Sequence, residues 1–240
     1  MKTSITLKTI WVSATLACVL SLQAQADTIN NGGFESGFSG WTRANQTGSE
    51  GTFSLQTGGL SPVNGDVVPA PPTGLTAAMS DAQGPGSHVL YQSFVVSAPV
   101  LQTLLSFDLF IGNRAAAFFA PNTLDFATPT LNQQARVDIL AGSADPFSVS
   151  ASDILLNVFR TNTGDPLASG YSRYSVDITA LLNSHLNTPL TLRFAETDNV
   201  STFQLGVDNV SIQAAPEPST WMLLTIGALA GVTWARRRAC

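Results

Sequence analysis

The chain has 240 residues and a formal net charge of −5; 44% of its residues are hydrophobic and only 11% are charged. Residues 27–215 hold 15 acidic side chains and 6 basic ones, all arginine, which gives 6 − 15 = −9. This charge repels phosphate backbones and anionic lipid head groups, so we expect no nucleic-acid partner and no peripheral membrane binding. Both cysteines, Cys18 and Cys240, lie in the end segments, so this region has no disulfide, and at about 190 residues it suits one domain.

The N-terminus has the three parts of a secretory signal peptide. Two lysines come first, an apolar run follows over residues 10–22, and an A-x-A cleavage site at residues 24–26 precedes Asp27. The apolar run is short for a membrane span. We therefore expect residues 1–26 to be a signal peptide and the mature chain to begin at Asp27.

Short stretches of alternating apolar and polar residues, separated by Gly, Pro, Asn, Asp and Ser, indicate an all-β domain over residues 27–215. The alternation predicts nine strands, near residues 52–56, 76–80, 89–96, 104–111, 135–140, 155–160, 171–178, 190–195 and 204–213. Long connections, such as the proline-rich residues 60–72 and the loop over residues 120–132, favour a two-sheet sandwich of jelly-roll type over a small barrel.

One short helix is predicted around residues 179–185. Thr179 is expected to cap its N-terminus, because a threonine hydroxyl can accept a hydrogen bond from an unpaired amide of the first turn. Leu181, Leu182 and Leu186 would pack onto the core.

The C-terminus carries an uncharged apolar run over residues 221–235, followed at once by Arg236, Arg237 and Arg238. These 15 residues would rise roughly 22 Å as a helix, against a bilayer hydrocarbon thickness of roughly 30 Å. We expect a marginal transmembrane helix over about 221–235, with the arginines as a membrane stop on the cytoplasmic side. The domain then lies outside the membrane.

Pro216, Glu217 and Pro218 stand just before this run. Prolines keep a chain extended, so this segment is accessible to a protease. The motif, the apolar run and the arginines, in this order at the extreme C-terminus, resemble the PEP-CTERM sorting signal. The resemblance implies that residues 216–240 are a tail processed by exosortase, a membrane-embedded transpeptidase-like enzyme of Gram-negative bacteria that make exopolysaccharide. It also implies an inner-membrane-anchored precursor that is later released to the cell surface or extracellular matrix.

A second resemblance concerns the domain itself. Residues 31–37 with Gly40-Trp41, and residues 206–212, are similar to the first and last strands of galactose-binding-like carbohydrate-binding modules. The resemblance implies that the two segments meet and that Glu35 and Asp208 join at a structural calcium ion, which prefers oxygen ligands. The alternative is that both carboxylates are solvated or bonded to turn amides. The core residues expected in these segments are Phe34, Trp41, Val207 and Val210.

Candidate catalytic motifs are sparse. The sequence has no H-E-x-x-H, G-x-S-x-G or P-loop. Glu196 and Asp198 form an E-x-D pair, but the position of a further glutamate is taken by Val200, so we interpret this segment as a strand-end loop. The two histidines, His88 and His185, are expected at the surface. We predict no catalytic residues, although no sequence pattern excludes a Ser-His-Asp triad, whose members need not be adjacent.

The sequence thus favours an exported, non-catalytic glycan-binding or structural module, with exopolysaccharide as a partner. The alternative is an extracellular polysaccharide-active hydrolase or lyase, because jelly-roll folds also host such enzymes. Alternation does not reveal which face each aromatic side chain occupies, so the sequence pattern identifies no ligand residues. The aromatic residues available to stack on sugar rings are Trp41, Tyr91, Tyr171 and Tyr174.

Overall fold

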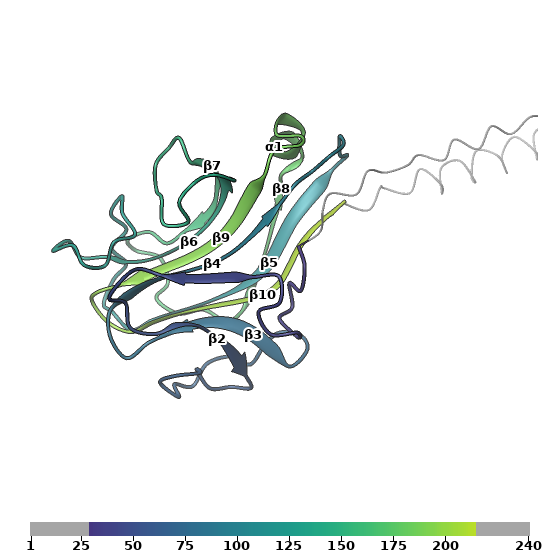
Figure 1. The fold of residues 1–240 in the computed structure, drawn as a ribbon. Helices are drawn as coiled ribbons and strands as arrows, with labels where there is room; N and C mark the ends of the chain where they lie inside the picture. The colour runs from purple at the N-terminus through teal and green to yellow at the C-terminus, as the bar shows by residue number, and fades with distance from the viewer. Residues whose placement is uncertain (1–28, 215–240) are drawn as a thin grey trace, which may run out of the picture.

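The computed structural model describes residues 29–214, which form ten strands and one short helix in two layers (Figure 1). The elements are β1 (Thr42–Asn45), β2 (Thr52–Thr57), β3 (Thr76–Asp81), β4 (Gly86–Phe94), β5 (Thr103–Asn113), β6 (Gln133–Ala141), β7 (Ile154–Arg160), β8 (Ser172–Asp177), α1 (Thr179–Ser184), β9 (Leu190–Asp198) and β10 (Phe203–Ala214). The predicted all-β class is confirmed.

The layers are two five-stranded antiparallel sheets. Sheet A has the order β1-β4-β9-β6-β7, and sheet B has the order β2-β3-β10-β5-β8. Within residues 29–214 only β2–β3 and β6–β7 are successive strands of one sheet, and every other connection crosses to the opposite sheet. Such crossing connections are typical of jelly rolls. The predicted two-sheet jelly-roll-type sandwich is therefore confirmed.

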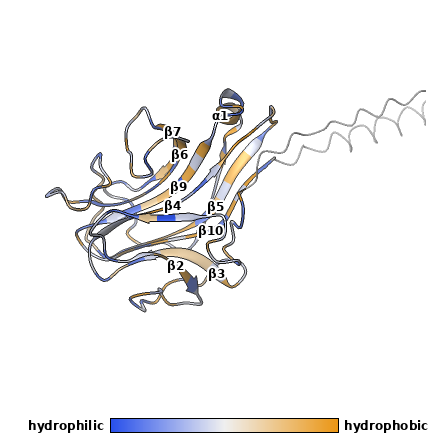
Figure 2. Cartoon of the chain, viewed as in Figure 1, coloured by the Kyte–Doolittle hydropathy of each residue, from blue (hydrophilic) through white to orange (hydrophobic). Residues whose placement is uncertain are grey.

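The core lies between the sheets because alternate residues of each strand point inward. Leu192 and Phe194 of β9 face Phe107 of β5, and the rings of Phe107 and Phe194 meet edge to face with centroids 5.3 Å apart. Figure 2 shows the resulting alternation, with hydrophobic residues (orange) between paler, more polar ones along β5 and β9. The four residues predicted for the core from the motif segments are all buried: Phe34, Trp41, Val207 and Val210.

One strand was not predicted. β1 has the sequence Thr-Arg-Ala-Asn, which lacks apolar alternation, and its four residues are mostly exposed. Its pairing with β4, from Thr42 opposite Tyr91 to Asn45 opposite His88, makes it a strand. Tertiary hydrogen bonding, rather than local pattern, decides its conformation.

The helix is present, but the predicted cap is wrong. α1 follows Ile178, which makes no side-chain capping bond. The hydroxyl of Thr179 instead accepts a hydrogen bond from the backbone amide of Thr103 at 2.7 Å, joining the helix to the start of β5. Leu182 is fully buried and Leu181 and Leu186 pack against the core, as predicted.

Two predictions about polar residues are also wrong. Glu196 and Asp198 lie within β9 rather than in a loop, and His88 is buried rather than at the surface. His88 is the cross-strand partner of Glu196, and Glu196 follows the inward-facing Phe194 by two residues. These side chains therefore share the inner face at one end of the sandwich.

Candidate functional site

The two motif segments meet, although the first is not a strand. Residues 31–37 form turns before β1, and the amide of Val210 in β10 donates to the carbonyl of Gly32 at 2.9 Å. A Cβ at Gly32 would lie 1.8 Å from the carbonyl oxygen of Val210, so only glycine allows this approach. The interpretation of residues 31–37 as a strand is corrected, because these residues bond to β10 through a turn.

Glu35 and Asp208, on the two sides of this junction, have different environments. Glu35 is exposed, and its Oε1 accepts hydrogen bonds from the amides of Leu75 at 2.8 Å and Thr76 at 3.0 Å, which lower the pKa of its carboxyl group. Asp208 is fully buried. Burial raises its pKa to about 7, and the charges of Asp108 and Glu35 act in the same direction.

Asp208 has a carboxylate oxygen that is available to ligate a metal ion. Its Oδ1 accepts from the amide of Asn209 at 2.7 Å, whereas its Oδ2 is buried without a partner among residues 29–214. A hard cation would satisfy such an oxygen. Over the same residues no three His, Cys, Asp or Glu side chains are grouped to hold a metal ion. The donor set therefore fits calcium only if backbone carbonyl or amide oxygens complete it, with Asp208 and Glu35 supplying the charge.

We propose that this junction binds calcium and expect calcium to stabilise the protein. A ligand that binds only the folded state adds about 2.7 kcal/mol at a hundredfold excess over Kd. This corresponds to a rise in Tm of several degrees, at about 2–4 °C per kcal/mol. Thermal melts of the full chain with calcium and with chelator measure the effect. Asp208→Ala should reduce it and Asp177→Asn, on β8, should not; a melting curve independent of calcium would contradict the site.

A separate groove lies on the outer face of sheet A. Residues 122–125 from the β5–β6 connection form one wall, residues 145–150 from the β6–β7 connection form the other, and together with Gln46 they enclose about 670 Å³. Volumes of about 300–1,000 Å³ are usual for small-molecule sites. Tyr91 of β4 and Phe147 of the groove both pack against one apolar cluster, formed by Val89, Leu124 and Ala195.

The groove combines an apolar patch with unpaired polar groups. Phe147 and Val149 are partly exposed, and Asn122 is exposed. Asp125 and Asp145 each accept hydrogen bonds on Oδ1, from the amides of Ala127 and Phe147 and, for Asp125, also from Gln46. Their Oδ2 atoms have no hydrogen-bond partner within the described chain. Acceptors beside an aromatic ring are the groups that recognise polyols with an apolar face.

A buried ion cluster holds one wall of the groove in place. Arg193 of β9 is fully buried and donates to the carbonyls of Pro146 and Ser148, each at 2.7 Å. It also pairs with Asp138 of β6, which Arg136 binds at 2.7 Å. Burial would raise the pKa of Asp138, but the two arginines outweigh it and keep that pKa below its usual value. The carboxylate therefore stays charged and orients Arg193 toward the loop.

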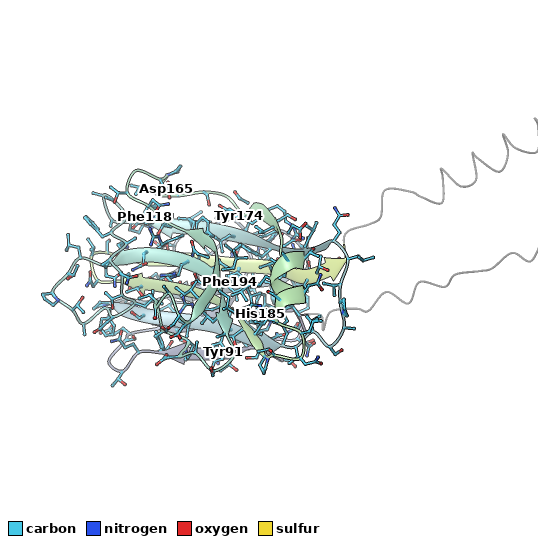
Figure 3. All side chains as sticks on the ribbon, turned by 90° about the horizontal axis from the view of Figure 1, so that it is seen from above. Tyr91, Phe118, Asp165, Tyr174, His185 and Phe194 are labelled. Atoms are coloured by element: carbon cyan, nitrogen blue, oxygen red, sulfur yellow. The ribbon has the colours of Figure 1, made fainter. Side chains whose placement is uncertain are left out.

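The four aromatic residues singled out from the sequence occupy different places. Trp41 is buried and donates from Nε1 to the carbonyl of Asn31 at 3.1 Å. Tyr171 donates to Gln56 at 2.7 Å on the outer side of sheet B. Tyr91 lies beside the groove, and Tyr174 lies at the opposite edge of the molecule (Figure 3). Sequence reasoning missed Phe147 and Arg193, since only their loop and strand were predictable.

The sorting residues Pro216, Glu217 and Pro218, the basic residues Arg236, Arg237 and Arg238, and the signal peptide lie outside residues 29–214. Between residues 29 and 214 the helical structure is neither long nor apolar enough to span a bilayer.

Fold and groove together define a two-sheet β-sandwich with an open polar cleft on one face. Residues 214–238 match the family described as the PEP-CTERM protein-sorting motif, which confirms the resemblance seen in the tail. The motif marks the chain for export and for sorting by exosortase. It covers the tail alone and does not bear on the ligand of the sandwich.

No curated protein matches the chain in sequence. Among solved structures, the K3 cleaved adhesin domain of Lys-gingipain from Porphyromonas gingivalis is similar at 13% identity and a TM-score of 0.46, covering 80% of this chain and 99% of that one. The module TmCBM61, solved with β-1,4-galactotriose, gives 11% identity, a TM-score of 0.42 and coverages of 78% and 97%. A cyclase from Fischerella sp. TAU is similar at 18% identity and a TM-score of 0.44, covering 80% of this chain and 98% of that one. These similarities concern the fold and not the ligand or the activity.

Proposed function

We propose that the protein is a non-catalytic module that is exported, sorted through its PEP-CTERM tail and binds glycan in the groove of sheet A. In this proposal the signal peptide is removed before Asp27, the apolar helix over about 221–235 anchors the precursor in the inner membrane, and exosortase cleaves the tail. The released sandwich then acts at the cell surface or in the extracellular matrix, where exopolysaccharide is its partner.

The groove is the observation that carries glycan binding. Its walls come from two loops on a rigid sheet, and Arg193 fixes one of them from below. A sugar ring has apolar C–H faces and polar edges, so it can lie on Phe147 while its hydroxyls donate to Asp125 and Asp145. The groove is open to solvent, so a chain of several sugar residues can lie along it.

The negative charge of the domain and of the groove restricts which glycans can bind. Residues 27–215 carry a net charge of −9, and two carboxylates stand in the groove. Acidic polysaccharides are repelled by this field. The groove therefore suits neutral chains, or chains that carry amino groups.

The position of Glu196 relative to the groove supports a non-catalytic role for the groove. Glycosidases use two carboxyl groups across a cleft, one with a raised pKa. Glu196 has a pKa raised well above its usual value by burial and by the charges of Asp198 and Asp81, but it is 1% exposed. It lines no part of the groove. A glycan in the groove would not reach it.

Phe147→Ala is expected to lower affinity for a neutral polysaccharide about tenfold, the effect of losing one aromatic contact of about 1.5 kcal/mol. Affinity electrophoresis against a panel of neutral and acidic polysaccharides measures it, with an activity screen on the same panel. Phe38→Ala is the matched control, because Phe38 is also partly exposed but lies outside the groove. Equal loss in both variants, absence of binding to the whole panel, or cleavage of a bound chain would each overturn the proposal.

A further inference from the structure

A second cavity opens where the edges of the two sheets face each other. β7 is the edge strand of sheet A and β8 is the edge strand of sheet B, and the connection between them crosses this edge. The cavity, here called the edge slot, encloses about 390 Å³ and is lined among others by Ile111, Phe118, Phe159, Asp165, Ser169 and Tyr174. In Figure 3, Phe118, Asp165 and Tyr174 lie along one edge of the molecule and Tyr91 lies along the other. The slot and the groove share no lining residue, so they are separate.

The slot has a rigid aromatic wall. Tyr174 stacks on Phe107 at a centroid distance of 5.4 Å and meets Phe159 edge to face at 5.2 Å. Phe118 packs against Phe203 at 5.7 Å and is fully buried, which closes the inner end. Phe159 and Tyr174 are only partly buried and are therefore available to a ligand.

Unpaired polar groups stand at the mouth of the slot. Asp165 accepts the amide of Asn162 on Oδ2 at 2.7 Å, and its Oδ1 has no partner within residues 29–214. No hydrogen bond engages the hydroxyl of Tyr174 in the same segment. Burial, together with the charge of Asp165, raises the pKa of Tyr174, so its hydroxyl remains a donor. The hydroxyl of Ser169 accepts the amide of Ile111 at 3.2 Å and keeps its own proton to donate.

We propose that the edge slot binds the terminal, non-acidic sugar residue of a glycan chain. The aromatic wall receives the apolar face of the ring, while Asp165 accepts from its hydroxyl or amino groups and Tyr174 and Ser169 donate to its oxygens. The closed inner end admits a chain end and stops a chain from passing through. Asp165 and the net negative charge of the domain exclude uronic acids.

The inference that the ligand is a sugar rests on the proposed function. The slot itself is a cavity separate from the groove. The groove takes internal segments of a chain and the slot takes its end. A glycan with many ends, such as a branched polymer, can therefore engage one molecule at two places, which strengthens attachment without any new contact.

Titration of the full chain with single sugars tests this proposal, in a detergent without a sugar head group. The probes are methyl glucoside, methyl galactoside, glucosamine and glucuronic acid, and binding is followed by ligand-observed NMR. We expect at least one of the first three to bind and glucuronic acid not to bind. Asp165→Asn and Tyr174→Phe should each weaken binding about tenfold, while Phe147→Ala should leave it unchanged. Thermal melts of each variant show that the fold is retained.

Failure of the slot proposal and failure of the groove proposal give different experimental results. If none of the four sugars binds while Phe147→Ala still weakens polysaccharide binding, the slot proposal is wrong and the groove proposal stands. If a sugar binds but only Phe147→Ala weakens it, the sugar lies in the groove and the slot is again rejected. Tight binding of glucuronic acid that depends on Asp165 would overturn the assigned specificity. If neither sugars nor polysaccharides bind, both proposals fail.

Discussion

Replacing Arg193 with methionine is expected to lower the free energy of unfolding by about 3–5 kcal/mol, the usual cost of breaking a buried ion pair. The substitution removes one of the two arginines that pair with the buried Asp138, and it leaves the carbonyls of Pro146 and Ser148 without their donor. Because these carbonyls belong to the groove wall, glycan affinity should fall as well. Urea denaturation and affinity electrophoresis measure the two effects.

Two variants control this prediction. Arg160→Met removes an exposed arginine at the end of β7 and should change stability by less than about 0.5 kcal/mol. Arg193→Lys keeps the charge but lacks the planar fork of donors, so it should give an intermediate loss. If Arg193→Met left both stability and glycan binding intact, the structural role of the cluster would be refuted.

Replacing Asp198 with asparagine should remove much of the pH dependence of stability between about pH 4 and 7. Burial raises the pKa of Asp198 from 3.8 to about 7, so in this range the folded protein binds a proton that the unfolded chain releases. The free energy of unfolding of the native protein therefore falls as pH rises from 3.8 to about 7. The full shift in the pKa of Asp198 corresponds to a decrease of about 4 kcal/mol in the free energy of unfolding.

The amide of the Asp198→Asn variant cannot ionise, but its oxygen can still accept the amide of Gly86, which Asp198 binds at 2.9 Å. Nearby groups contribute to the pH dependence of both proteins. Burial raises the pKa of Glu196, and it lowers that of His88 to about 4, so neutral His88 makes stability rise between about pH 4 and 6.5. The difference between the two curves of unfolding free energy reports the titration of Asp198 together with the effect of its charge on the pKa of Glu196. If the free energies of unfolding of the native protein and of Asp198→Asn changed in parallel from pH 4 to 7, Asp198 would be ionised throughout this range.

The sequence pattern was sufficient where a local signal decides structure. Alternation over residues 174–178 and 190–195 predicts strands because an apolar residue at every second position must face a core, whatever the rest of the chain does. Leu181, Leu182 and Leu186 predict a short packed helix because residues about one helical turn apart share a face, and an apolar face must meet the core. The PEP-CTERM tail is also a local feature, since its motif, apolar run and arginines are contiguous in sequence.

Only the tertiary structure decided which residues meet. β1 exists because β4 pairs with it, and His88 is buried because the opposite sheet covers its face. The groove joins Gln46 to two loops about 80 and 100 residues further on, and Arg193 reaches the second of these loops from a strand beyond it. The edge slot likewise needs both sheets to place Phe159 beside Tyr174. Contacts between residues far apart in sequence depend on the order of strands in the sheets, and apolar alternation carries no information about that order.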